Sequence, residues 1–191
     1  MFHNDILLVD LEMSSDDPNT CDLVEIGAVL LDNRTLEIQD EYNSLIKPEM
    51  GEWTSKAEQV HGRKRDYLLK VGRDCKSVIS EFEKVFDLNN VRLACWNIYD
   101  VEILRRLLKT GINNTHKIFE LWSYTYPYLL LQGITPSKEN VHGLNYFLER
   151  FHISRTEPHD ALSDARAEAE VFKRITKFYL NEFSFRLVNT E

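Results

Sequence analysis

The first 48 residues carry apolar, β-branched runs that alternate with polar segments. The apolar runs occupy residues 6–13, 24–32 and 37–48, and the polar segments between them span residues 14–22 and 33–36. Such runs are typical of strands, and the short polar segments suit turns. Because strands joined by short connections pair antiparallel, this part of the chain predicts a three-stranded meander.

The pattern changes after Pro48. A mixed segment covers residues 54–62, and a helical period of apolar residues follows over 77–88. A short apolar run at 91–97 then leads into a second helical pattern over 100–111. A meander followed by alternating strand and helix predicts an α/β fold, in which a mixed sheet is flanked by helices.

The last part of the chain is mostly helical by the same criterion. Residues 117–131 contain one more predicted strand, and an irregular segment lies between this run and the next predicted helix. Two amphipathic helices are predicted over 139–151 and 161–180, the second with Asp160 as its N-cap. The tail from residue 181 either packs back on the fold or is loose. No repeat, low-complexity tract or linker interrupts residues 1–191, so we expect one domain.

Composition agrees with a globular chain that has a substantial core. The 191 residues are 43% hydrophobic, and no apolar stretch reaches the length of a membrane span. The N-terminus lacks the basic region and cleavage site of a signal peptide, so we expect a cytoplasmic protein without a membrane partner. The three cysteines are far apart in the sequence, which favours buried thiols over disulfides.

The net charge of −8 gives no support for binding to a polyanion. Residues 61–76 depart from this balance, with six basic side chains against two acidic ones. Arg63, Lys64 and Arg65 form the densest part of this segment and are candidate contacts to a phosphate backbone. An ordinary solvated loop that leads into a helix would have the same composition.

Four carboxylates stand inside or directly after apolar runs: Asp10, Glu12, Asp100 and Asp164. An uncompensated buried carboxylate is unfavourable by several kcal/mol or more, so this pattern predicts a bound cation. Oxygen ligands without Cys or His in the set favour Mg²⁺ or Mn²⁺ over zinc.

The spacing of these residues adds to the prediction. Asp10 and Glu12 are two residues apart in a predicted strand, so they share one face and can bind the same ion. Asp164 lies in the first turn of a predicted helix, where the helix dipole favours a carboxylate. His159, five residues earlier, supplies a titratable base near the same site. The predicted chemistry is metal-assisted hydrolysis.

Three motifs occur in a defined order along the chain. They are Asp10-Leu11-Glu12 with Glu25-Ile26-Gly27 downstream, Asn97 three residues before Asp100, and His159 five residues before Asp164. In this order they resemble the DEDDh exonucleases, the RNase H-like family that includes polymerase proofreading subunits, oligoribonuclease and ribonuclease T. The resemblance extends from about residue 5 to residue 175.

The resemblance implies a fold and a reaction. The fold would be an RNase H-like mixed sheet of five strands, in which an antiparallel meander is followed by parallel strands. The reaction would be 3′→5′ exonuclease hydrolysis of single-stranded DNA or RNA with a free 3′ end. Two Mg²⁺ or Mn²⁺ ions would be held by Asp10, Glu12, Asp100 and Asp164, and His159 would take the proton from the attacking water.

The chain departs from the family pattern at two places. Met13-Ser14-Ser15 stands where many members have Thr-Gly, and Trp96 stands where many have His before the motif Asn. Neither departure removes a metal ligand, but both affect the pocket for the terminal nucleotide. Leu11, Met13 and Asn97 are the candidate contacts in that pocket, although apolar residues of a strand also commonly belong to the core.

Two other functions remain open at this point. One is a non-catalytic nucleic-acid-binding or protein-binding module that keeps the fold without turnover. The presence of all four carboxylates and of His159 weighs against it. The other is a metal-dependent phosphodiesterase for short oligonucleotides, which the acidic surface suits because a small substrate needs few phosphate contacts. The sequence distinguishes neither DNA from RNA nor one protein partner from another.

Overall fold

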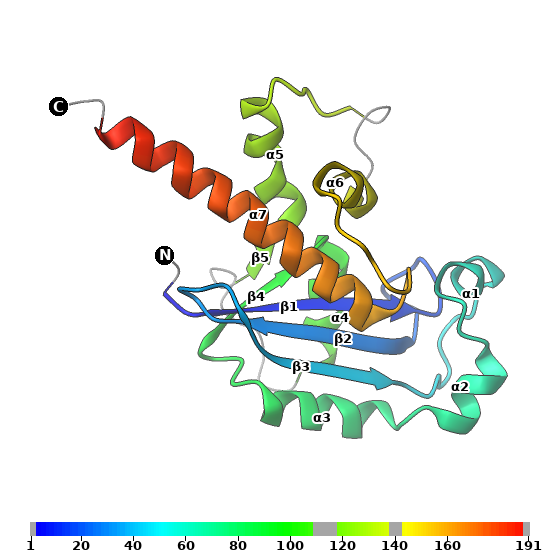
Figure 1. Ribbon diagram of the computed structural model, residues 1–191. Coiled ribbons are helices and arrows are strands. Elements are labelled where there is room, and N and C mark those ends of the chain that lie inside the picture. The colour runs from blue at the N-terminus through cyan, green and yellow to red at the C-terminus, as the bar shows by residue number, and fades with distance from the viewer. Residues whose placement is uncertain (1–2, 109–117, 138–142, 189–191) are drawn as a thin grey trace.

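The computed structural model describes residues 3–108, 118–137 and 143–188 (Figure 1). Its strands form a five-stranded sheet in the order β3-β2-β1-β4-β5. The strands are β1 (Asp5–Met13), β2 (Leu23–Leu31), β3 (Ile38–Leu45), β4 (Val91–Cys95) and β5 (Ile118–Glu120). β1 pairs antiparallel with β2 and β2 with β3, whereas β1 with β4 and β4 with β5 are parallel. The predicted mixed sheet is therefore confirmed.

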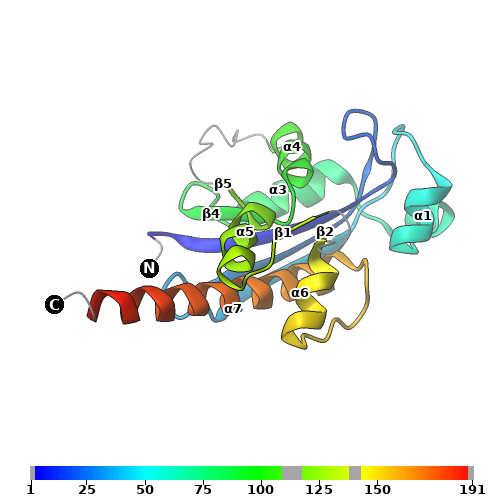
Figure 2. The ribbon, with the colours of Figure 1, turned by 90° about the horizontal axis from the view of Figure 1, so that it is seen from above.

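Helices cover both faces of this sheet. They are α1 (Ser55–His61), α2 (Arg65–Val71), α3 (Cys75–Val85), α4 (Ile98–Leu107), α5 (Leu121–Leu131), α6 (Gly143–Phe151) and α7 (Ala161–Val188). α7 crosses one face with α5 and α6 packed against it, and α3 and α4 lie on the opposite face (Figure 2). Among the described residues, no helix has both the length and the apolar character that a bilayer crossing requires.

The alternation of side chains along β1 divides the core into two parts. Leu7 points to the α3 and α4 side, where it belongs to the same buried cluster as Phe82. Leu8 points the other way and belongs to a second cluster with Phe172 of α7. Because strand residues alternate between faces, Asp10 continues the row of Leu8 and faces α7. This alternation carries a carboxylate to the face on which α7 lies.

The strand predicted within residues 117–131 is limited to β5, and the rest of that run forms the helix α5. Pro127 lies inside it, and a proline in a helix interior removes a hydrogen bond and disfavours the helix. Two features compensate: Glu120 caps the first turn by accepting a hydrogen bond from the Ser123 amide, and Tyr128 and Leu129 are buried against α6 and α7. Tertiary packing therefore outweighs local propensity here.

Four other predicted segments differ from the structure or lie partly outside the described residues. The mixed segment 54–62 forms α1, which Thr54 caps and Gly62 ends with a φ of 68°. The tail from residue 181 continues α7 as far as Val188. Residues 109–111 of one predicted helix and 139–142 of another lie outside the described residues.

Candidate active site

The site forms where β1 runs on beyond its pairing with β4. The parallel pairing covers Asp5 to Leu8 of β1, after which the chain from β4 turns into α4. Crevices at the carboxyl ends of neighbouring parallel strands are common ligand sites. Asp10 and Glu12 lie on this extension of β1, and the first turn of α4 carries Asp100, which is 3% exposed.

Gly27 allows α7 to approach the sheet directly opposite this extension. It is the cross-strand partner of Asp10 on β2. A Cβ atom at this position would lie 2.1 Å from the carbonyl carbon of Ala161, a distance that real Cβ atoms do not show. The first turn of α7 thus rests on bare backbone, and this contact explains the glycine of the Glu25-Ile26-Gly27 motif. It also brings Asp164 over the acidic end of β1.

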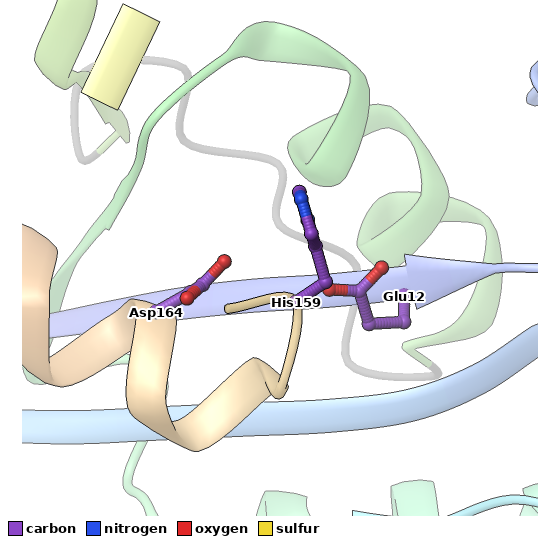
Figure 3. Close-up of side chains that lie close together, drawn as sticks. All are labelled: Glu12, His159 and Asp164. Atoms are coloured by element: carbon purple, nitrogen blue, oxygen red, sulfur yellow. The ribbon is translucent and has the colours of Figure 1, made fainter. Parts of the chain in front are cut away.

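The loop before α7 holds His159 in an unusual backbone conformation. His159 has a φ of 59°, in the left-handed region that residues other than glycine rarely adopt. The prediction that Asp160 caps α7 is confirmed, since its Oδ1 accepts a hydrogen bond from the Ser163 amide at 2.9 Å. As a result, Glu12, His159 and Asp164 each offer a ligand atom, and these atoms all lie within 4.8 Å of one another (Figure 3).

Arg63 connects β2 to this loop. Its Nε and Nη2 donate to the two carboxylate oxygens of Glu25 at 3.0 and 3.2 Å, and Nη2 also donates to Asp160 Oδ2 at 2.8 Å. Glu25 faces Glu12 across the β1–β2 pairing, so the guanidinium compensates a like-charge pair. The sequence predicted Arg63 as a phosphate contact, but in the structure its charge is engaged by two carboxylates.

Asp10 is the carboxylate most affected by its neighbours. Its Oδ2 is buried and has no hydrogen-bond partner among the described residues. Burial raises the pKa of Asp10 well above its usual range, and the nearby Glu168, Asp100, Glu12 and Asp164 raise it further. Burial is also the main cause that raises the pKa of Glu12 to about 8 and that of Asp100 to about 7. Without a cation, this cluster retains protons.

Asp164 differs because the protein supplies a cation beside it. Arg155 Nη1 lies 3.0 Å from both carboxylate oxygens of Asp164, and both side chains are almost fully buried. Burial raises the pKa of Asp164, while Arg155 and His159 lower it. Arg155 does not belong to any of the three motifs, and its partner Asp164 lies nine residues further along the chain.

Glu168 is a second residue that the motifs did not identify. It is 1% exposed, it is one helical turn after Asp164 on α7, and its Oε2 has no hydrogen-bond partner among the described residues. Burial raises its pKa well above the usual range, with contributions from Asp100 and Asp164. The available signal was its spacing of four residues from Asp164, which places both side chains on one helix face.

A pocket of about 240 Å³ adjoins the carboxylates. Its lining includes Glu12, Met13, Ala57, His61, Asn97 and Tyr99. Asn97 also caps α4, since its Oδ1 accepts from the Tyr99 amide at 2.8 Å. Leu11, predicted together with Met13 as a base contact, is 5% exposed and packs in the core on the α3 and α4 side. Met13 is only partly buried against the same cluster, so it also lines the pocket.

His61 presents an unusual polar group at the pocket. Its Nδ1 accepts a hydrogen bond from the Arg63 amide at 2.9 Å, which leaves the other ring nitrogen to carry the proton. That nitrogen, Nε2, is buried and has no partner among the described residues. Burial and the charge of Arg63 lower the pKa of His61, so its neutral form is favoured.

The comparisons with known proteins cover nearly the whole chain. The RNase_T family model, described as an exonuclease, matches residues 7–172. The PolC-type DNA polymerase III of Thermotoga petrophila is 28% identical over 172 residues, which are 90% of this chain and 12% of that polymerase. The PolC-type enzyme of Thermotoga maritima matches to the same extent. The chain thus spans about an eighth of the length of these relatives.

Solved structures share the fold at low sequence identity. The nuclease domain of 3′hExo, a DEDDh family member bound to rAMP, has a TM-score of 0.71 and 18% identity and covers 92% of this chain and 93% of its own. Exonuclease I of E. coli in complex with a dT13 oligonucleotide has a TM-score of 0.76 and 15% identity, over 96% of this chain and 43% of its own. These likenesses establish the RNase H-like sheet.

Proposed function

The chain belongs to the RNase_T exonuclease family, and we propose that it is a divalent-metal-dependent 3′→5′ exonuclease that acts on single-stranded DNA or RNA. The observation that carries the proposal is the meeting of buried carboxylates from β1, α4 and α7 with His159 at the end of β1. A protein has no structural reason to bury so many acidic groups together, and a pair of cations compensates them.

The donor set fits divalent metal ions. Asp10 has a buried oxygen that no described residue hydrogen-bonds, and the ligand atoms of Glu12, His159 and Asp164 lie within 4.8 Å of one another. Carboxylate oxygens suit Mg²⁺ or Mn²⁺, and we propose that Asp10, Glu12, Asp100 and Asp164 hold two such ions. When bound, the ions would lower the pKa of a water molecule and stabilise the leaving oxygen of the phosphodiester.

We assign His159 as the general base that accepts the proton of the attacking water. The neighbouring Asp160 is held from two sides, by the Ser163 amide and by Arg63, so the loop has little freedom to carry the imidazole away. The backbone strain at His159 is consistent with this role, since strained conformations persist where the surroundings enforce them.

The adjoining pocket would receive the 3′-terminal nucleotide. Met13 and Tyr99 offer surfaces on which a base can stack, and Asn97 adds an amide. The buried Nε2 of His61 has no acceptor within residues 3–108, 118–137 and 143–188, so it could donate to a sugar or phosphate oxygen. Lys64 and Arg65 are exposed and would contact phosphates upstream, whereas Arg63 would act mainly through its ion pairs.

A second candidate is a phosphodiesterase for short oligonucleotides. The net charge of −8 and the modest size of the pocket favour it, because few phosphates then need compensation. The two functions differ in how turnover depends on length. An exonuclease keeps its activity as the oligomer is extended, whereas the phosphodiesterase loses activity beyond a few nucleotides.

A labelled-oligomer assay tests the proposal. Single-stranded DNA and RNA of several lengths, labelled at the 3′ or the 5′ end, would be incubated with Mg²⁺, with Mn²⁺ or with EDTA. We expect 3′-terminal nucleotides to be released first, EDTA to stop the reaction, and the Asp164→Asn variant to be inactive. Release from the 5′ end, or full activity in EDTA, would contradict the proposal.

A further inference from the structure

Glu168 occupies a position where an acidic side chain requires an explanation. It follows Asp164 by one turn of α7, so the two side chains share a face of the helix. Ala165 and Ala169, on either side, are buried against the sheet, and Glu168 is 1% exposed. The carboxylate of Glu168 therefore points into the protein and not into solvent.

The charged groups that act on Glu168 within the described part of the chain are carboxylates. Oε2 of Glu168 has no hydrogen-bond partner among the described residues, and the charges that act on it are those of Asp100 and Asp164. Glu168 in turn is the strongest of the neighbouring charges acting on Asp10. A buried carboxylate in this position is unfavourable by several kcal/mol unless a cation or a proton joins it.

Glu170, two residues further along the same helix, provides the contrast. It is half-exposed and forms ion pairs with Arg174 at 2.9 Å and with Lys173 at 3.9 Å. The helix thus places one glutamate on its solvated face, with lysine and arginine partners. The other glutamate lies on the buried face, where its described neighbours are acidic.

We propose that Glu168 is a fifth carboxylate of the metal centre and lies on the side of Asp10 and Asp100. The inference rests on the proposed function and extends it, because the ligand set indicated by the motifs contains four carboxylates. The charges also balance: two divalent ions and Arg155 supply five positive charges against the five carboxylates. Glu168 thereby strengthens the hold on the metal at the buried end of the site.

Metal binding to the Glu168→Gln variant tests this assignment, with Glu170→Gln as the matched control on the same helix. Both variants remove one negative charge and keep the side-chain shape. Titration calorimetry of the metal-free proteins with Mn²⁺ should show affinity weakened by about tenfold or more in Glu168→Gln, as for loss of a residue that supports a metal site. Glu170→Gln should bind Mn²⁺ like the wild type.

The outcomes separate this inference from the proposed function. Wild-type Mn²⁺ affinity in Glu168→Gln would overturn the assignment and make Glu168 a protonated core residue. If Asp164→Asn also bound Mn²⁺ like the wild type, the metal site itself, and with it the proposed function, would fail. Should Glu168→Gln not fold, Glu168→Ala removes the carboxylate without burying a new amide. The same loss of affinity is expected there, and its absence would again overturn the assignment.

Discussion

The carboxylate cluster has two halves that differ in how their charge is compensated. We call Glu12 and Asp164 the balanced half, and Asp10, Asp100 and Glu168 the unbalanced half. In the balanced half, Arg155 binds both oxygens of Asp164, and Arg63 lowers the pKa of Glu12. In the unbalanced half, every neighbour that acts on Asp10 and Glu168 raises the pKa of these carboxyl groups.

The difference shows which part of the site depends on an added cation. In the balanced half a nearby guanidinium offsets part of the effect of burial, although the pKa of both carboxyl groups is still raised. The unbalanced half must either retain protons or bind metal, since burial penalises its charged form. We therefore expect a bound metal to replace protons at the buried end of the site, and at Asp164 to compete with or join Arg155.

The largest expected effects come from Asp10→Asn and Asp164→Asn, one substitution in each half. Both should lower kcat by at least about three orders of magnitude, since members of one catalytic unit fail together. Their metal-free forms should differ: Asp10→Asn should melt higher than wild type, because the folded state no longer has to bind a proton there that the unfolded state releases. Asp164→Asn should melt lower, because Arg155 is left almost buried without its partner.

Calorimetric melting in EDTA checks this difference, and about 1 kcal/mol corresponds to a shift of roughly 2–4 °C in a protein of this size. Equal shifts of the same sign in the two variants would mean that the halves are not distinct. Asp16→Asn is the control, since its carboxylate is exposed and lies outside the cluster.

His159→Ala should lower kcat by roughly 10²–10⁴, the range for loss of a general base. Mn²⁺ affinity should change little, because the carboxylates hold the metal. His152→Ala is a matched control, since His152 also has a positive φ, 52°, and lies outside the cluster. If both variants lost a similar amount of activity, the lower kcat would be due to the strained backbone and not to loss of the His159 imidazole.

The metal-free protein should lose stability as the pH rises. The pKa of Glu12 is raised to about 8 and that of Asp100 to about 7, so the folded state keeps protons that the unfolded state has already released. The free energy of unfolding should therefore be highest below about pH 4 for these groups and fall up to about pH 8.

With Mn²⁺ the trend should reverse, because metal binding requires deprotonated ligands. The gain in melting temperature on adding Mn²⁺ should grow between pH 5 and pH 8, as measured by differential scanning fluorimetry with and without EDTA. If the stability of the metal-free protein does not change over this range, the carboxylate cluster does not retain protons.

The smallest effect is expected outside both halves. Replacing Lys64 and Arg65 together with Ala should raise KM for long oligomers, leave kcat nearly unchanged and reduce the salt slope of binding by up to about 2. Lys76 and Lys84 of α3 provide a control pair for the same change of charge. An identical salt dependence in both double variants would make residues 64–65 an ordinary solvated surface.

Much of this molecule follows from local sequence patterns. The meander, the helices 77–88 and 161–180 and the three motifs were predicted, because period and spacing are properties of short segments. The family match confirms the resemblance that those motifs indicated. The strand predicted within residues 117–131 is limited to β5, and α5 was not predicted, because that helix depends on burial against α6 and α7.

The arginines that pair with the carboxylates of the site could not be predicted from local sequence patterns. Arg63 meets Asp160 across 97 residues of sequence, and no pattern in residues 61–76 distinguishes a paired arginine from a solvated one. Arg155 lies nine residues from Asp164, within a loop that has no periodicity. Glu168 carried a usable signal in its spacing, but its burial depends on how closely α7 approaches the sheet.

That approach depends on Gly27, a residue that contributes no functional group. A single methyl group at this position would overlap the backbone of Ala161 and Leu162. In a saturation-mutagenesis screen for activity, substitutions of Gly27 should therefore reduce activity as strongly as substitutions of the carboxylates. Gly27 itself would contact neither metal nor substrate. A screen that reports folding would separate the two classes, because there Gly27 variants would fail and several carboxylate variants would pass.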